Sequence, residues 1–340
     1  MKKIITLLLT FSSVIILIIS QTGCSEKPVE KTSYYMDTLC KITIYDMEDM
    51  SQEHAENAIA EAFALCADYE QLLSYTKEDS DISRINQAGG KPVECDPRTV
   101  EVIQKGLEYG EISDGVFDIT LGRVTDLWDF HAETPVVPSE EDTRLAMEGV
   151  GYEQVKIQGN TVTMGNGQAQ LNLGGVGKGY VGDKAAECLE KAGVTSAIIN
   201  FGGNIIAIGD KSGEAFSIGI QKPFGDSSQT IGTLAVKDTT VVTSGIYERS
   251  FERDGKLYHH ILDTKTGYPK DTDVVSVTLI GGKGSSADCD AMSTLCLLLG
   301  VEKGKAFIES TDGVEAIFVD QDGNLTKTSG IDRYGFVEGE

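Results

Sequence analysis

The stretch "LNLGGVGKGY", residues 171–180, joins a short apolar alternation to a segment with the pattern of a helix. The junction contains four glycines and a lysine, namely Gly174, Gly175, Gly177, Gly179 and Lys178. Glycine permits positive φ and close approach of a ligand, and free N–H groups at a helix start attract anions. The spacing matches neither G-x-G-x-x-G nor G-x-x-x-x-G-K-[ST]. Phosphate binding and tight strand-to-helix packing are both open interpretations.

The pattern of strands and helices around this junction indicates the fold class. From residue 153 onward strand patterns dominate, from the hairpin "VKIQGNTVTM" at 155–164 to "VVSVTLI" at 274–280. Helices are expected near 179–191 and 288–299, and in the first half over 51–73 and after Asp96-Pro97, with a strand in "YYMDTLCKITIYD" from residue 34. Runs of strands with inserted helices predict an α+β fold, with a doubly wound sheet as the second choice.

The N-terminus has the pattern of an export signal. Lys2 and Lys3 precede an uncharged apolar run, which closes on Gln21-Thr22-Gly23-Cys24. Small residues before a cysteine resemble the lipobox of bacterial lipoproteins. We therefore expect a signal peptide over 1–23, a lipid on Cys24, a tether over 24–32 and a folded domain over 33–340. A permanent single helix and a simple cleaved signal are the alternatives.

The composition is strongly acidic. The chain has 29 basic and 53 acidic residues and a net charge of −24, and loss of Lys2 and Lys3 with the signal makes it more negative. Such a surface repels nucleic acid and anionic headgroups, so membrane association is expected through the lipid alone. An anionic ligand needs a prepared site, such as bound metal or aimed N–H groups. Six cysteines remain besides Cys24, and disulfides among them are possible.

A second stretch, "SSADCDAMSTLCLLLG", carries oxygen ligands at helical spacing. Asp290 and Thr294 are four residues apart, so they lie on one face of the helix, one turn apart. Two oxygen ligands with room for water and phosphate suit Mg²⁺. The alternative is that Asp290 is a first-turn acid and that Thr294 bonds back to its own helix.

A third stretch, residues 243–269, holds two of the four histidines. His260 and Asp263 are close enough in sequence for the acid to orient an imidazole that accepts a proton from a nucleophile. A packed, hydrogen-bonded histidine is the alternative. Upstream, Tyr75, Phe117 beside Asp118, and Trp128 are candidates to stack a planar ring and accept ribose hydroxyls, although core packing explains Phe117 and Trp128 equally well.

Together these segments resemble the ApbE-type FAD:protein FMN transferases from about Tyr34 to the end of the chain. The matching motifs are Met36-Asp37-Thr38, "DSDISRIN", "SDGVFDIT", "LNLGGVGKGYVGDKA", "NFGGNI", "TSGIYERSF", "YHHILDTKTGYP" and "ADCDAMST". The chain departs from the family pattern at Asn172, where aspartate is common, at Thr264, where proline is expected, and at Asp37, where glycine is frequent.

The resemblance implies a T-fold-like α+β architecture of mixed sheets and packed helices, with the flavin site between two intertwined subdomains. It implies a lipid-anchored enzyme at the extracytoplasmic face of the bacterial cytoplasmic membrane. Such an enzyme uses Mg²⁺ to split FAD and passes FMN to a Ser or Thr hydroxyl of an acceptor protein, with release of AMP. The acceptor implied is an exported FMN-bearing redox protein or a subunit of a membrane redox complex.

The resemblance also assigns residues. The implied metal ligands are the Gly175 carbonyl, Asp290 and Thr294, with Ser293 nearby. The implied FAD contacts are Met36, Tyr75, Val116, Phe117, Asp118, Asn172, Lys178 and Ile261. His260 matches the base that activates the acceptor hydroxyl, with Asp263 as its expected orienting acid.

Rival functions stay open. A Mg²⁺-dependent FAD pyrophosphatase would have the same site, with water in place of the acceptor hydroxyl. A non-catalytic flavin-binding or solute-binding lipoprotein would need none of Asp290, Thr294 and His260. A protein that itself carries covalent FMN has little support, because only "DITLG" at 118–122 approaches an acceptor segment.

Overall fold

The computed structural model describes residues 27–339, apart from 46–49, 131, 166 and 227. The expected signal peptide and the lipid-bearing Cys24 lie outside these residues. Within the described part of the chain, no helix combines the length and the apolar character needed to cross a membrane.

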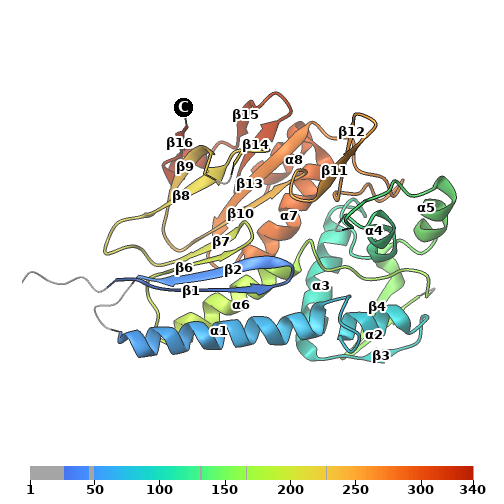
Figure 1. Ribbon diagram of the computed structural model, residues 1–340, viewed down its shortest axis with the longest axis horizontal. Helices are drawn as coiled ribbons and strands as arrows, with labels where there is room; N and C mark the ends of the chain where they lie inside the picture. Colours follow the sequence, from blue (N-terminus) through green and yellow to red (C-terminus); the bar gives the residue numbers. More distant parts are fainter. Residues whose placement is uncertain (1–26, 46–49, 131, 166, 227, 340) are drawn as a thin grey trace, which may run out of the picture.

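An eight-stranded sheet forms the centre of the molecule (Figure 1). Its strands, in spatial order, are β1 (Val29–Tyr35), β2 (Thr38–Ile44), β6 (Ala197–Phe201), β7 (Asn204–Ile208), β10 (Thr239–Gly245), β13 (Val274–Gly282), β14 (Glu315–Asp320) and β15 (Leu325–Lys327). Every neighbouring pair is antiparallel. The prediction of an α+β fold is confirmed, and a doubly wound sheet is excluded because that fold requires parallel strands.

Two layers cover the central sheet. On one face lie the helices α1 (Gln52–Leu73), α6 (Gly177–Lys191), α7 (Ser286–Leu299) and α8 (Val301–Glu309). On the other face lies a three-stranded sheet of β8 (Phe216–Gln221), β9 (Thr230–Val236) and β16 (Val337–Glu338). Two adjacent residues of β10 show that both faces of the sheet are covered. Val242 packs in the core on the helix side, and Val241 packs in the core on the side of the three-stranded sheet. Burial on both faces explains why the central strands read as continuous apolar runs.

A second region packs beside these layers (Figure 1). It contains α2 (Asp81–Gln87), α3 (Pro97–Ile112), α4 (Gly122–Trp128), α5 (Glu140–Met147), a sheet of β3 (Val93–Glu94), β5 (Thr161–Met164) and β4 (Val155–Gln158), and the hairpin of β11 (Ser250–Arg253) and β12 (Lys256–His259). The 3-10 helix η1 (Tyr152–Gln154) contacts α3 in this region, whereas η2 (Ile331–Tyr334) contacts β9 and β14 of the two-sheet part. Trp128 is fully buried here, and its indole N–H donates to the Gly267 carbonyl at 2.8 Å. Trp128 is therefore a core residue, as the packing interpretation allowed.

Local capping signals predicted the helix starts well. The Ser51 hydroxyl accepts the backbone N–H of His54 at the start of α1, and the Asp96 carboxylate accepts that of Arg98 at the start of α3, where Pro97 is the first helical residue. Both contacts satisfy N–H groups that the helix itself leaves unpaired.

The expected single strand after Ser33 is instead a hairpin, and it begins earlier. β1 starts at Val29 and so includes residues that were expected to form the tether. Met36 and Asp37 form its two-residue turn, with φ of 51° and 55°. Positive φ at both turn residues is the geometry that matches the twist of a hairpin, and glycine adopts it most easily. This explains why glycine is frequent where this chain has Asp37.

Candidate active site

The glycine-rich junction lies beside the "SDGVFDIT" segment. Leu121 and Gln170 form a parallel β-bridge, and the Asn172 N–H donates to the Ile119 carbonyl at 2.8 Å. The Asn172 side-chain oxygen accepts the Gly174 N–H at 2.8 Å. An aspartate oxygen would accept the same N–H, so this contact stabilises the turn equally well with either residue.

None of the four junction glycines adopts the positive φ that the sequence suggested. Gly175 is needed for space, because a Cβ there would lie 2.9 Å from the Phe117 ring and 3.6 Å from the Thr294 hydroxyl. Gly179 has the tightest surroundings, since its Cβ would lie 2.1 Å from the Ser286 carbonyl oxygen at the start of α7. Packing therefore accounts for the glycine at both positions, and phosphate binding stays a prediction. Gly179 serves packing between α6 and α7, and Gly175 keeps the chain open beside Phe117 and Thr294.

We expect Gly179→Ala to lower the free energy of unfolding by about 3 kcal/mol or more, because the added methyl group meets backbone rather than a flexible side chain. Urea denaturation monitored by circular dichroism measures this change. Gly177→Ala is the matched control, since its Cβ would have nothing nearer than 4.0 Å and alanine favours a helix. Equal stability of the two variants would contradict the packing role of Gly179.

The implied metal ligands converge between α6 and α7. Asp290 is 1% exposed, and its Oδ2 accepts the Gly179 N–H at 2.9 Å. Its Oδ1 lies 3.4 Å from the Lys178 ammonium nitrogen. The Thr294 hydroxyl lies 3.4 Å from the Asp290 carbonyl oxygen of its own helix, which is long for a hydrogen bond, so this hydroxyl is not firmly committed to the helix. The Ser293 hydroxyl lies 2.8 Å both from the Asp290 carbonyl and from the Ser244 hydroxyl of β10, so it joins α7 to the sheet.

This donor set fits Mg²⁺. Gly175, Asp290 and Thr294 would offer a carbonyl, a carboxylate and a hydroxyl, all hard oxygen ligands. The space that glycine leaves at position 175 brings its backbone next to the Thr294 hydroxyl. The described residues contain no group of three or more His, Cys, Asp and Glu side chains suited to a metal. A set with one carboxylate suits a cation that keeps water and substrate oxygens in its coordination shell.

His260 has the geometry of a general base, with a different partner from the one expected. Its Nδ1 lies 3.2 Å from the Arg249 carbonyl oxygen, which can only accept, so Nδ1 carries the proton and Nε2 keeps a lone pair. The expected pair with Asp263 is not formed, because the Asp263 carboxylate instead accepts the Lys270 ammonium at 2.7 Å and the Lys265 N–H at 2.8 Å. Asp263 therefore organises its own turn, and the Arg249 carbonyl orients the imidazole.

Burial, and then the positive charge of Arg249, lower the pKa of His260 from 6.5 to about 3. The imidazole is therefore neutral at physiological pH, as a base must be. Because the pKa is lower in the folded than in the unfolded state, the contribution of this group to stability is complete above 6.5 and is lost as pH falls toward 3.

We expect the rate of the base-dependent step to show no acid limb near pH 6.5, because His260 stays neutral down to about pH 5. A pH profile of kcat for flavin transfer between pH 5 and 8 measures this. An acid limb centred near 6.5 that vanishes in His260→Asn would contradict the depressed pKa.

Some of the residues expected to contact FAD already form hydrogen bonds that hold the backbone in place, and others do not. The Asp118 carboxylate already accepts hydrogen bonds from the Thr120 N–H, the Thr120 hydroxyl and the Tyr152 N–H, at 2.6–2.8 Å. It therefore holds its loop in shape and has little capacity left for a ribose hydroxyl. Tyr75 is half-buried, and burial raises the pKa of its phenol. Met36 donates its N–H to the Glu70 carboxylate at 2.7 Å, which ties the β1–β2 turn to α1.

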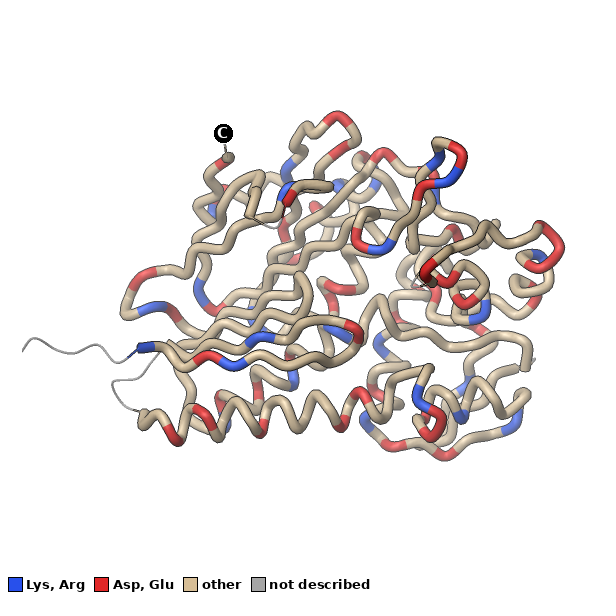
Figure 2. The backbone as a smooth tube through the Cα atoms, in the orientation of Figure 1, with Lys and Arg blue, Asp and Glu red and all other residues tan. Residues whose placement is uncertain are grey.

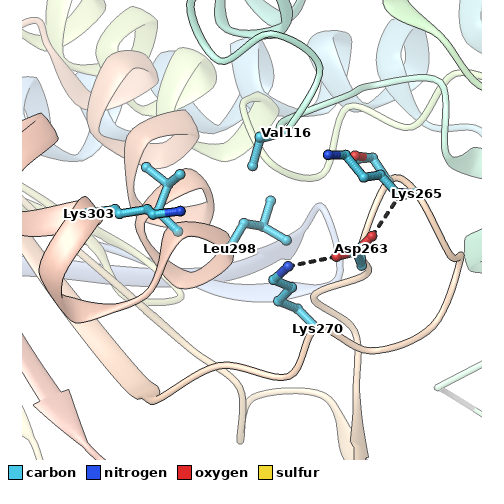
Figure 3. Close-up of a pocket in the computed structure, with 8 residues that line it drawn as sticks. Val116, Asp263, Lys265, Lys270, Leu298 and Lys303 are labelled. Carbon is cyan, nitrogen blue, oxygen red and sulfur yellow. Dashed lines mark hydrogen bonds and ion pairs between the residues drawn. The ribbon is translucent and has the colours of Figure 1, made fainter.

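Val116 lies at a cavity of about 240 Å³ (Figure 3). The cavity is lined by Val116, Asp263, Thr264, Lys265, Lys270, Leu298, Leu299 and Lys303. The Thr264 hydroxyl donates to the Gly115 carbonyl at 2.8 Å, so this departure from proline adds a link between the 263–267 turn and the Val116 segment. Ile261 is 5% exposed, and its carbonyl accepts the Lys270 N–H at 2.8 Å.

Three groups near the site were not singled out from the sequence. Glu248 and Arg249 precede β11, and the opposite charges of Lys178 and Asp290 both act on the pKa of Glu248, which desolvation raises. Asn204 begins β7 and lies 3.5 Å from the Lys178 ammonium. The sequence feature that could have pointed to Asn204 is a polar residue at the start of an otherwise apolar strand. Acidic and basic residues are interspersed over the chain (Figure 2), so charge pattern alone does not mark this place.

The six described cysteines are all free thiols, at Cys40, Cys66, Cys95, Cys188, Cys289 and Cys296. Burial raises the pKa of Cys40 to about 11 and that of Cys289 to about 12. These thiols therefore behave as small core residues.

The model of the ApbE family matches residues 36–318. The FAD:protein FMN transferase of Treponema pallidum is 34% identical over 311 residues, which cover 86% of this chain and 85% of that protein. That of Klebsiella pneumoniae is 35% identical over 281 residues, covering 81% and 86%. The crystal structure of the ApbE protein of Thermotoga maritima superposes with a TM-score of 0.82 at 29% identity, over 92% of this chain and 100% of that one. The flavin transferase ApbE of Vibrio cholerae gives a TM-score of 0.79 at 26% identity, over 91% and 99%.

Proposed function

Because the chain belongs to the ApbE family, we propose that it is a Mg²⁺-dependent transferase that moves the FMN half of FAD to a serine or threonine hydroxyl of an acceptor protein and releases AMP. The observation that carries the proposal is the meeting of Asp290, Lys178 and the Gly175–Thr294 pair between α6 and α7. This place offers oxygen ligands for a divalent cation and a positive charge for phosphate within an acidic protein.

In the proposed reaction the acceptor hydroxyl oxygen bonds to the phosphorus of the FMN phosphate. The pyrophosphate P–O bond breaks, and its electron pair leaves with AMP. The hydroxyl proton passes to Nε2 of His260, which the Arg249 carbonyl holds in the required tautomer. Lys178 would bind phosphate oxygens from the first turn of α6. Mg²⁺ held by Gly175, Asp290 and Thr294 would neutralise phosphate charge and polarise the phosphorus.

Phosphoryl transfer asks a protein mainly for alignment and charge neutralisation. The buried Asp290 and the packed α6–α7 junction supply rigid positions for both, because a shift of either helix would break the contact from the Gly179 N–H to Asp290. One histidine base then suffices if the acceptor hydroxyl is held in line with the breaking bond.

The test is to incubate the purified protein with FAD, Mg²⁺ and a candidate exported acceptor, and to follow AMP release and the mass of the acceptor. An acceptor that gains the mass of FMN on a serine or threonine, matched by AMP, supports the transferase. AMP and free FMN without a mass gain favour the pyrophosphatase. No cleavage at all would contradict both and favour a flavin-binding protein.

The proposed location is the extracytoplasmic face of the cytoplasmic membrane, with a lipid anchor on Cys24. Its support is the leader pattern of residues 1–24. The acceptor would then be an exported flavoprotein or a subunit of a membrane redox complex. Mass spectrometry of the membrane-bound protein should find a lipid on Cys24 as the first residue, and a mature N-terminus without lipid would contradict the anchor.

A further inference from the structure

A buried amide without a partner lies beside the candidate metal site. Asn204, the first residue of β7, is 1% exposed. Its side-chain oxygen lies 3.5 Å from the Lys178 ammonium nitrogen. Its side-chain nitrogen, Nδ2, has no hydrogen-bond partner among the described residues. Nearly all buried polar groups in proteins are hydrogen-bonded, so two free N–H donors at this place call for an explanation.

The orientation of the amide is determined by Lys178. If the amide were rotated by half a turn, its NH₂ group would face the ammonium, and two donors would oppose each other. The oxygen therefore faces Lys178, and the NH₂ group is the part left without an acceptor. Leaving such a group unpaired in a dry interior costs about 1–3 kcal/mol, which an oxygen ligand would recover.

The unpaired Asn204 amide lies close to Asp290, because Lys178 contacts both side chains. The Lys178 ammonium lies 3.5 Å from the Asn204 oxygen and 3.4 Å from Asp290 Oδ1, both longer than ordinary hydrogen bonds. The ammonium has three donors and holds neither oxygen tightly. The nearby hydroxyls of Ser244 and Ser293 already bond to each other at 2.8 Å. Lys178 and the adjoining Asn204 amide therefore both keep donor capacity that the protein does not use.

We propose that Asn204 is a further substrate-binding residue, whose side-chain NH₂ group donates to an oxygen of the FAD pyrophosphate while its side-chain oxygen positions Lys178. The inference rests on the proposed function, because it assumes that FAD binds between α6 and α7. It adds a neutral side-chain donor beside Lys178.

Two variants separate the donor from the positioning role. Asn204→Asp has nearly the same shape and keeps an oxygen for Lys178, but it lacks the NH₂ donor. Asn204→Leu removes both polar atoms. We expect Asn204→Asp to weaken FAD and ADP binding about ten- to one-hundredfold, measured by calorimetry without metal, because a hydrogen bond to a charged oxygen is lost. Asn204→Leu should weaken binding further, because Lys178 also loses the oxygen that positions it. The melting temperature of the free Asn204→Asp protein should not fall, since the amide nitrogen has no protein partner to lose and an oxygen still faces Lys178.

Thr240→Val is the matched control. The Thr240 hydroxyl is also buried and unpartnered in the described structure, and Thr240 pairs with Ile206, two residues along β7 from Asn204. This variant should bind FAD and ADP like the wild type. Wild-type affinity in Asn204→Asp would overturn the donor role, and a lowered melting temperature with unchanged affinity would show a purely structural residue. If the wild type binds ADP but cannot transfer flavin, and the Asn204 variants lose ADP binding, the result would support Asn204 and contradict the proposed function. A wild type that binds neither FAD nor ADP would overturn both.

Discussion

Replacing Asp290 with asparagine is expected to slow Mg²⁺-dependent AMP release from FAD on the order of a thousandfold, because a metal supplies several kcal/mol of charge stabilisation in such reactions. Asparagine keeps an oxygen to accept the Gly179 N–H, so the contact between α6 and α7 survives while the carboxylate charge is lost. Steady-state AMP release at increasing Mg²⁺ concentration measures the effect. Excess Mg²⁺ should restore only part of the rate, since a neutral ligand binds the cation more weakly.

Asp288→Asn is the control for this experiment. Asp288 lies two residues earlier on α7, and its carboxylate accepts the Lys105 ammonium at 2.9 Å and the Tyr109 hydroxyl at 2.8 Å, away from the candidate metal ligands. Its replacement should leave the Mg²⁺ dependence unchanged. If Asp290→Asn kept wild-type activity in buffer freed of other metals, Asp290 would not be a ligand of the catalytic metal.

His260→Asn should reduce the rate of flavin transfer to the acceptor by about a hundredfold to ten-thousandfold, the range for loss of a general base. The asparagine NH₂ group can still donate to the Arg249 carbonyl, so the chain before β11 stays in place, but no lone pair takes the place of Nε2. Single-turnover transfer, with FAD affinity measured in parallel, separates the two roles. FAD affinity should change little.

His259→Gln is the matched control, because the buried His259 ring uses Nε2 to contact the Lys270 carbonyl at 3.1 Å and a glutamine amide can replace that donor. Transfer should remain near the wild-type rate. If His260→Asn lost FAD affinity and transfer to the same extent, His260 would shape the pocket rather than accept the proton.

The sequence offered a list of residues for the candidate site, but it did not predict most of the contacts that these residues make. Asp290 and Thr294 lie one turn apart on a helix, as their spacing required. The spacing of His260 and Asp263 was equally suggestive, yet Asp263 pairs with Lys270. A carboxylate takes whichever donor the folded loop brings nearest, and a short sequence distance does not decide that choice.

Several features of the fold followed from local chemistry. Ser51 and Asp96 mark helix starts because each satisfies an N–H group within three residues of itself. The antiparallel pairing of β4 and β5 follows from the Gly159-Asn160 turn between them. The β1–β2 turn was missed because Met36 and Asp37 adopt positive φ without glycine.

The sequence by itself determined the α+β class, most helix and strand positions and the family, since these depend on periodicity, caps and motifs within short stretches of chain. Only the tertiary structure decided that Gly179 is a packing glycine, that the Arg249 carbonyl orients His260 and that Asn204 has a free donor. Each of these depends on groups brought together from separate elements. Asp290 meets the Gly179 N–H across 111 residues of sequence, because antiparallel strands and packed helices bring distant segments into contact.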